Sequence, residues 1–84
     1  MAALVTRRVR EPIQMAAKSF GFFPRAFVWR GRKHDIRAVE SCRTENARGR
    51  VAKHVFRVRT DAAVLELAQD VKRDAWRVEQ VWGL

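Results

Sequence analysis

The sequence predicts one small domain built mainly from antiparallel β-strands. The chain has 84 residues, enough for one core and too few for two domains. Its 48% hydrophobic and 32% charged residues are typical of a folded chain rather than a disordered one. Residues 26–39 and 51–60 alternate apolar and polar side chains as half-buried strands do. Together these observations favour an all-β fold.

The N-terminal quarter predicts a tail, a strand and a loop. Residues 1–8 are expected to be a flexible tail, which leaves 9–84 as the single β domain. Residues 9–15 contain Pro12, which interrupts a helix but is tolerated in an edge strand. Residues 19–24 combine Gly and Pro with three Phe, so we expect a loop that closes one end of the core.

Residues 25–40 carry the clearest hairpin signal. Two β-prone runs, 26–29 and 34–39, flank a turn at 30–33, in which Gly31 can adopt the positive φ of a tight turn. Alternation directs four side chains of this hairpin to one face: Phe27, Trp29, Ile36 and Ala38.

The polar segment 41–50, which contains Asn46 and Gly49, predicts a loop. Residues 51–60 then alternate again and predict a third strand. Its two faces differ in chemistry. One carries His54, Phe56 and Val58, and the other carries Lys53, Val55, Arg57 and Arg59.

Residues 61–82 support two interpretations. An apolar stripe at spacings of three and four, from Val64 to Trp82, favours a helix that Asp61 caps, which would make the domain α+β. The β-branched and aromatic residues near its end favour two strands, 64–68 and 75–81, joined by a turn at 70–74. The residues alone leave both open.

Three motifs resemble a known family. In order they are F-V-W-R-G-R at 27–32, R-V-R-T-D at 57–61 and W-R-V-E-Q-V at 76–81. They resemble a small bacterial domain family of unknown function, covering nearly the whole chain from Val9 onward. Similar domains stand alone or lie at the C-terminal end of catalytically inactive relatives of Y-family translesion polymerases. The resemblance implies no catalytic residue.

The resemblance also implies strands rather than a helix over 61–82. The expected fold is then five or six short antiparallel strands curled into a barrel or half-barrel, SH3-like or OB-like in scale. Leu65, Leu67, Trp76 and Val78 would join the core. The chain departs from the family in lacking a glycine turn after Asp61, which weakens the expected hairpin there.

The charge is basic and uneven. The chain has 18 Lys and Arg against 9 Asp and Glu, a net charge of +9. Residues 1–59 hold 15 of the bases and four acids, a net charge of +11, whereas residues 60–84 carry −2. Such a balance indicates an anionic partner, and arginine suits phosphate.

Five basic residues are the predicted nucleic-acid-binding site. Arg30, Arg32 and Lys33 share the hairpin tip, and Arg57 with Arg59 share one strand face, while Arg48, Arg50 and Lys53 lead into that strand. We expect DNA or RNA to bind there through its phosphates with little sequence preference. Trp82 and Phe22 are the candidates for stacking on a base.

Enzymatic and metal chemistry are not expected. Cys42 is the single cysteine, so it cannot form an internal disulfide or a multi-thiolate zinc site. His34 and His54 lack ligand spacing and fall on the core-facing side of their strands. No glycine-rich phosphate loop or membrane-length apolar run occurs. We therefore expect a cytoplasmic binding module without cofactor, small-molecule substrate or membrane; the alternative is a protein–protein interaction module, in a DNA-repair assembly.

Overall fold

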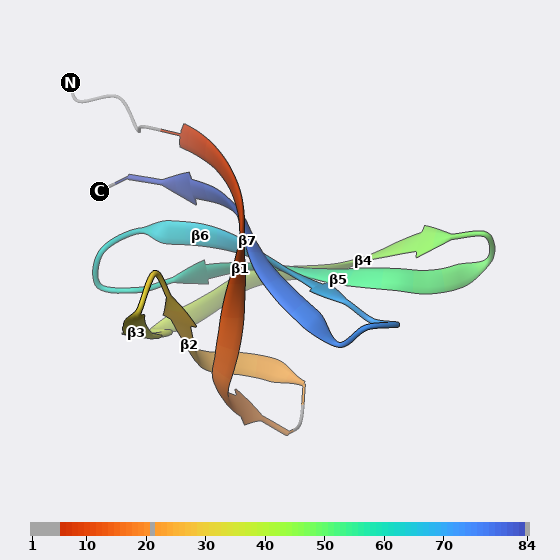
Figure 1. Ribbon diagram of the computed structural model, residues 1–84, viewed down its shortest axis with the longest axis horizontal. Helices are drawn as coiled ribbons and strands as arrows, with labels where there is room; N and C mark the ends of the chain where they lie inside the picture. The colour runs from red at the N-terminus through yellow and green to blue at the C-terminus, as the bar shows by residue number, and fades with distance from the viewer. Residues whose placement is uncertain (1–5, 21, 84) are drawn as a thin grey trace.

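The domain is one antiparallel β-sheet. The structure, a computed structural model, describes residues 6–20 and 22–83, and this part of the chain contains no helix (Figure 1). It contains seven strands: β1 (Thr6–Ser19), β2 (Phe23–Trp29), β3 (Arg32–Asp35), β4 (Ala38–Ala47), β5 (Arg50–Arg59), β6 (Val64–Asp70) and β7 (Ala75–Trp82). Their order in the sheet is β3-β2-β1-β7-β6-β5-β4. The all-β prediction is confirmed.

The sheet curls strongly but stays open. The chain passes from one edge to the other within two residues. The peptide N–H of Ile36 donates to the carbonyl of Arg25 on β2, and that of Arg37 donates to the carbonyl of Arg59 on β5, at 2.9 and 2.7 Å. The edge strands β3 and β4 do not pair with each other. The fold is thus an open curled sheet with more strands than the expected five or six, and not a closed barrel.

The strands expected over 61–82 are confirmed, and the helical alternative is wrong. β6 and β7 form a hairpin in which Leu67 lies opposite Val78 and Gln69 opposite Trp76. Every second side chain then points into the core, which buries Leu65 and Leu67 more completely than a helical stripe would. Tertiary packing overrides the helical spacing here.

The predicted loop over 41–50 is wrong, because β4 occupies most of it and pairs with β5 from Ala38 to Ala47. β4 is an edge strand and most of its side chains are exposed, so its sequence shows no apolar alternation. The predicted strand over 34–39 is broken at Ile36 and Arg37, where the chain turns from β3 to β4. Both differences from the prediction occur where the chain leaves one edge strand, β3, and enters the other, β4.

β1 lies at the centre of the sheet and not at its edge as expected. Pro12 is tolerated there because the β1–β2 pairing begins only at Gln14, so at Pro12 only the β7 side is paired. A bulge between Arg8 and Glu11, with Arg10 at φ 54°, separates two stretches of the β1–β7 pairing. Residues 6–8, placed in the expected tail, pair with β7, and residues 1–5 lie outside the described residues.

The core lies on the inner face of the curled sheet. It comprises Ile13, Phe27, Phe56, Val58, Leu65, Leu67, Trp76 and Val78. Phe56 stacks on Trp76 with ring centroids 5.6 Å apart, and Phe22 from the β1–β2 connection closes the end of this cluster. Of the other residues expected inside, Trp29 and Ile36 are half-buried and Ala38 is exposed.

Candidate nucleic-acid interface

The outer face of the sheet carries the charge. On β7 the side chains of Trp76 and Val78 enter the core, so those of Arg77 and Glu79 project outward. On β5 the same alternation buries Phe56 and Val58 and places Lys53 outside. Because neighbouring strands are in register, the outward side chains of β1, β7, β6 and β5 form a continuous surface.

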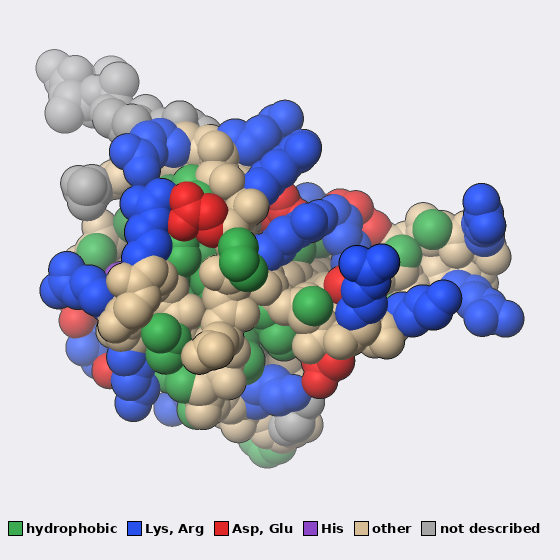
Figure 2. Space-filling view, in the orientation of Figure 1, with side chains coloured by type: hydrophobic (Ala, Val, Ile, Leu, Met, Phe, Trp, Pro, Cys, Tyr) green, Lys and Arg blue, Asp and Glu red, His purple; other side chains and the backbone are tan. Residues whose placement is uncertain are grey.

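Three adjoining hollows together form what we call the outer groove. The first lies beside Glu79, the second beside Arg77, and the third between the end of the β4–β5 hairpin and the β6–β7 turn. The first and second share Arg10 and Lys53, and the second and third share Ala52 and Asp70. Nine bases line the groove: Arg8, Arg10, Arg43, Arg48, Arg50, Lys53, Lys72, Arg73 and Arg77. The acids that line it are three, Glu66, Asp70 and Glu79. Basic side chains accordingly spread across this face toward the end of the β4–β5 hairpin (Figure 2).

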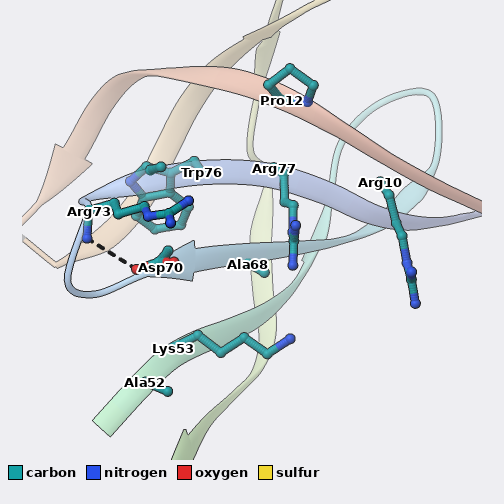
Figure 3. A pocket seen from close by; sticks show the side chains of 10 residues that line it. Arg10, Pro12, Ala52, Lys53, Ala68, Asp70, Arg73, Trp76 and Arg77 are labelled. Atoms are coloured by element: carbon teal, nitrogen blue, oxygen red, sulfur yellow. Dashed lines mark hydrogen bonds between the residues drawn. The ribbon is translucent and has the colours of Figure 1, made fainter.

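Glu79 organises the centre of the outer groove. Its carboxylate lies 2.7 Å from Arg77 Nε, 4.0 Å from Lys53 Nζ and 3.9 Å from Arg10 Nε. These three bases come from three strands, and their side chains surround one hollow (Figure 3). Lys53 also lies 3.5 Å from Glu45, so two carboxylates face three cations and a net positive charge remains at the centre.

The far end of the outer groove is still less neutralised. Among the described residues, no carboxylate forms an ion pair with any of four bases there: Arg48, Arg50, Lys72 and Arg73. Asp70, the acid nearest to them in the lining, accepts a hydrogen bond from the backbone N–H of Arg73 at 3.1 Å and so stabilises its own turn. These four cations are free to bind an external anion.

The five basic residues predicted from the sequence lie elsewhere, in two separate places. Arg30, Arg32 and Lys33 lie at the turn between β2 and β3, whereas Arg57 and Arg59 lie on β5, and none of the five lines the outer groove. No hydrogen bond or ion pair among the described residues joins the two sets.

Most of these five residues have partners inside the protein. Arg30 donates to both carboxylate oxygens of Glu11, at 2.8 and 2.6 Å. Lys33 lies 3.9 Å from Asp35, and Arg59 pairs with Glu40. The Arg57 guanidinium lies 4.6 Å from the centroid of Trp82. Arg32 has no carboxylate partner among the described residues.

The aromatic candidates also have partners. Trp82 is half-buried beneath Arg57, and Phe22 packs edge-on against His54 and Phe56. The freely exposed ring is that of Phe20, which is 97% exposed and precedes the turn into β2.

Two signals could have located the outer groove from the sequence. The alternation of Arg77 and Glu79 with buried residues marks the outer face of β7. The bases Arg48 and Arg50 flank Gly49, which marks a hairpin tip once 41–50 is taken as a strand. Arg8 and Arg10 could not be placed, because Arg8 pairs with Gln80, which is distant in the sequence.

Glu11 ties the β2–β3 turn to β1. Besides Arg30, it accepts a hydrogen bond from Trp29 Nε1 at 2.8 Å. These bonds, that from Arg30 first, lower the pKa of Glu11 from 4.5 to about 2. A carboxyl whose pKa is lower in the folded state stabilises the fold above its unfolded pKa and loses that contribution as the pH falls through the folded value.

We therefore expect the urea midpoint to fall as the pH drops from about 4.5 to about 2. Glu11→Gln keeps an acceptor for Trp29 but has no charge to protonate, so its midpoint should fall less steeply over this window. Urea titrations at pH 5, 3.5 and 2.5 measure both proteins. Equal pH dependence in the two would contradict the role of Glu11.

The cysteine and the two histidines lie in the following surroundings. Partial burial raises the pKa of the Cys42 thiol, which disfavours the reactive thiolate. His54 Nδ1 lies 3.3 Å from Thr44 Oγ1, and the His34 ring stacks on Phe27. In residues 6–20 and 22–83, no three His, Cys, Asp or Glu side chains are grouped to hold a metal ion, and no helix is long and apolar enough to cross a membrane.

The fold and its surface define a class: a small open β-sheet domain with an apolar inner face and a basic groove on the outer face. The chain belongs to the family described as Domain of unknown function (DUF6504), whose model matches residues 1–84. No curated protein and no solved structure matches it. The resemblance to a domain family of unknown function is thereby confirmed over the whole chain.

Proposed function

We propose that this domain is a non-enzymatic, cytoplasmic module that binds nucleic acid through its basic outer face with little sequence specificity. The observation that carries the proposal is the outer groove, which nine bases and three acids line. Such a surface attracts a polyanion and gains free energy when the counterions of the phosphates are released.

The kind of contact follows from the side chains. Arginine and lysine on an exposed sheet face reach phosphate oxygens, which position a nucleic acid but carry no sequence information. Five of the nine bases, Arg8 and the four at the far end, have no carboxylate partner among the described residues, so binding phosphate breaks no ion pair at those positions. The groove therefore supports general phosphate binding more than base reading.

The test is a fluorescence-anisotropy titration of the whole chain with labelled single-stranded and duplex oligonucleotides at 50 and 200 mM salt. We expect a dissociation constant of about 1–100 μM near physiological salt, and an affinity that rises at least tenfold at the lower salt. The logarithm of the affinity should fall linearly with that of the salt concentration. Absence of binding at 50 mM salt would overturn the proposal.

One observation favours a second candidate, a protein–protein interaction module. Phe20 exposes 97% of its surface, and Phe23, three residues further along the chain, exposes 39%. An apolar ring in water is typical of a site that docks on a protein partner. The resemblance to domains attached to inactive translesion polymerases would make a DNA-repair assembly the setting. Failure of oligonucleotide binding at low salt would favour this candidate.

A further inference from the structure

The end of the β4–β5 hairpin projects beyond the rest of the sheet. The last register pair between β5 and β6 joins Lys53 to Asp70, and one further backbone bond runs from the N–H of Val71 to the carbonyl of Ala52 at 3.1 Å. β4 and β5 continue to pair as far as Ala47 and Arg50. We call residues 46–52 the arm. From Ala52 to the turn at Gly49 it extends about 10 Å past the sheet, at about 3.4 Å per residue. In Figure 1 the arm forms the free end of the longest hairpin, and Figure 2 shows basic side chains at its end.

The arm is slim and cationic. Its sequence is N-A-R-G-R-V-A, in which Ala47, Gly49 and Ala52 keep the two-stranded ribbon narrow. Its two charged side chains are both bases, Arg48 and Arg50. Neither forms an ion pair with a carboxylate in the part of the chain that the structure describes. The arm and the β6–β7 turn, which adds Lys72, together line a hollow of about 710 Å³.

The turn of the arm holds an arginine in an unfavourable conformation. Arg48 has φ 53° and precedes Gly49 at φ 75°, positions where Asn-Gly is the favoured pair. The β2–β3 turn repeats this geometry at Arg30 and Gly31, but there Glu11 and Trp29 hold the guanidinium. No partner of this kind holds Arg48 among residues 6–20 and 22–83. Its charge at the tip therefore has no role within the described part of the fold.

We propose that the arm inserts into the major groove of duplex DNA while the adjoining outer groove holds the phosphates beside it. This inference rests on the proposed nucleic-acid binding and adds the form of nucleic acid. A two-stranded ribbon fits the major groove of B-form DNA, which is about 12 Å wide and about 8.5 Å deep. The major groove of A-form RNA is too narrow and deep to admit it. Arg48 and Arg50 then reach the base edges or the inner phosphates.

The test compares a double variant, Arg48→Asn with Arg50→Ala, with a control, Lys18→Ala with Arg32→Ala. Each removes two positive charges from exposed positions, and the control residues lie outside the outer groove. Asn suits the left-handed turn position better than Arg, so the arm variant should unfold at the same temperature as the parent or higher. Loss of binding therefore cannot be attributed to loss of the fold.

Each protein is titrated with one sequence prepared as duplex DNA, duplex RNA and single-stranded DNA. We expect the parent to prefer duplex DNA, and the arm variant to lose at least tenfold in affinity for it. The arm variant should lose at least threefold less affinity for the other two probes than for duplex DNA, because they lose phosphate contacts alone, and the control should change less than threefold on all three. An equal loss on every probe would overturn insertion while leaving phosphate binding intact. Absence of binding by the parent would overturn the proposed function itself.

Discussion

Replacing Phe56 with alanine is expected to lower the free energy of unfolding by about 3–5 kcal/mol. Phe56 is 0% exposed and stacks on Trp76, while Phe22 and Phe23 contact it edge-on. Removing its ring leaves a cavity where the core meets the connection between β1 and β2. A chain of 84 residues has a total stability of only about 4–13 kcal/mol, so this single change removes a large share.

Urea titration at 25 °C measures the loss, and Phe20→Ala is the matched control. Both substitutions delete the same ring, but Phe20 is 97% exposed, so its removal should change the stability by less than about 0.5 kcal/mol. Equal effects at the two positions would show that Phe56 is not the centre of the core. A smaller loss of stability than 1 kcal/mol at Phe56 would lead to the same conclusion.

The second large effect concerns the outer groove. Lys72→Glu combined with Arg73→Glu should weaken the binding of any oligonucleotide about a hundredfold at low salt, since two phosphate contacts are lost and two repulsive charges are added. Neither base has an ion-pair partner among the described residues, so the fold should be unaffected. The slope of log affinity against log salt should decrease by about 2.

The control for this experiment reverses the same charge at another site. Arg32→Glu with Lys33→Glu changes the net charge equally but lies at the β2–β3 turn, outside the outer groove. If contacts in the groove matter, this control should lose less than about fivefold. If the two variants lose affinity equally, total charge rather than the groove drives binding. If the control loses more, the turn is the true site.

The sequence predicts well the strands with one buried face. The alternation that identifies β5 also buries Phe56 and Val58 as expected, and Gly31 lies at positive φ in the turn after β2. The motif around Trp76 is likewise part of a strand, although its apolar spacing resembles that of a helix. These elements are predictable because the inner face alone determines their pattern.

The prediction fails where position in the sheet decides the outcome. β4 has no buried face along most of its length, so its polar sequence is indistinguishable from a loop. Pro12 suggests that β1 is an edge strand. An interior position is acceptable because a bulge precedes Pro12 and because β1 pairs with β2 only from Gln14 onward. Pairing partners are not encoded in local alternation.

The outer groove could be predicted only in part for the same reason. The sequence shows that the first 59 residues carry a net positive charge, and that Arg48 and Arg50 flank Gly49. It does not show that Arg10 on β1, Lys53 on β5 and Arg77 on β7 meet around one carboxylate. That convergence depends on the register of strands far apart in the chain.

The pairing of β1 with β7 at the centre of the sheet has a consequence for folding. β1 cannot complete its pairing until β7 is in place, since Thr6 lies opposite Trp82 and Ile13 opposite Trp76. During folding, the two groups of neighbouring strands, β1–β3 and β4–β6, can each pair locally, which leaves one unpaired strand edge on each. Pairing with β7 then joins them and encloses the core. Domains that depend on such distant pairings typically fold in milliseconds to seconds rather than microseconds. Throughout that interval the partly folded chain exposes unpaired strand edges that are prone to aggregate.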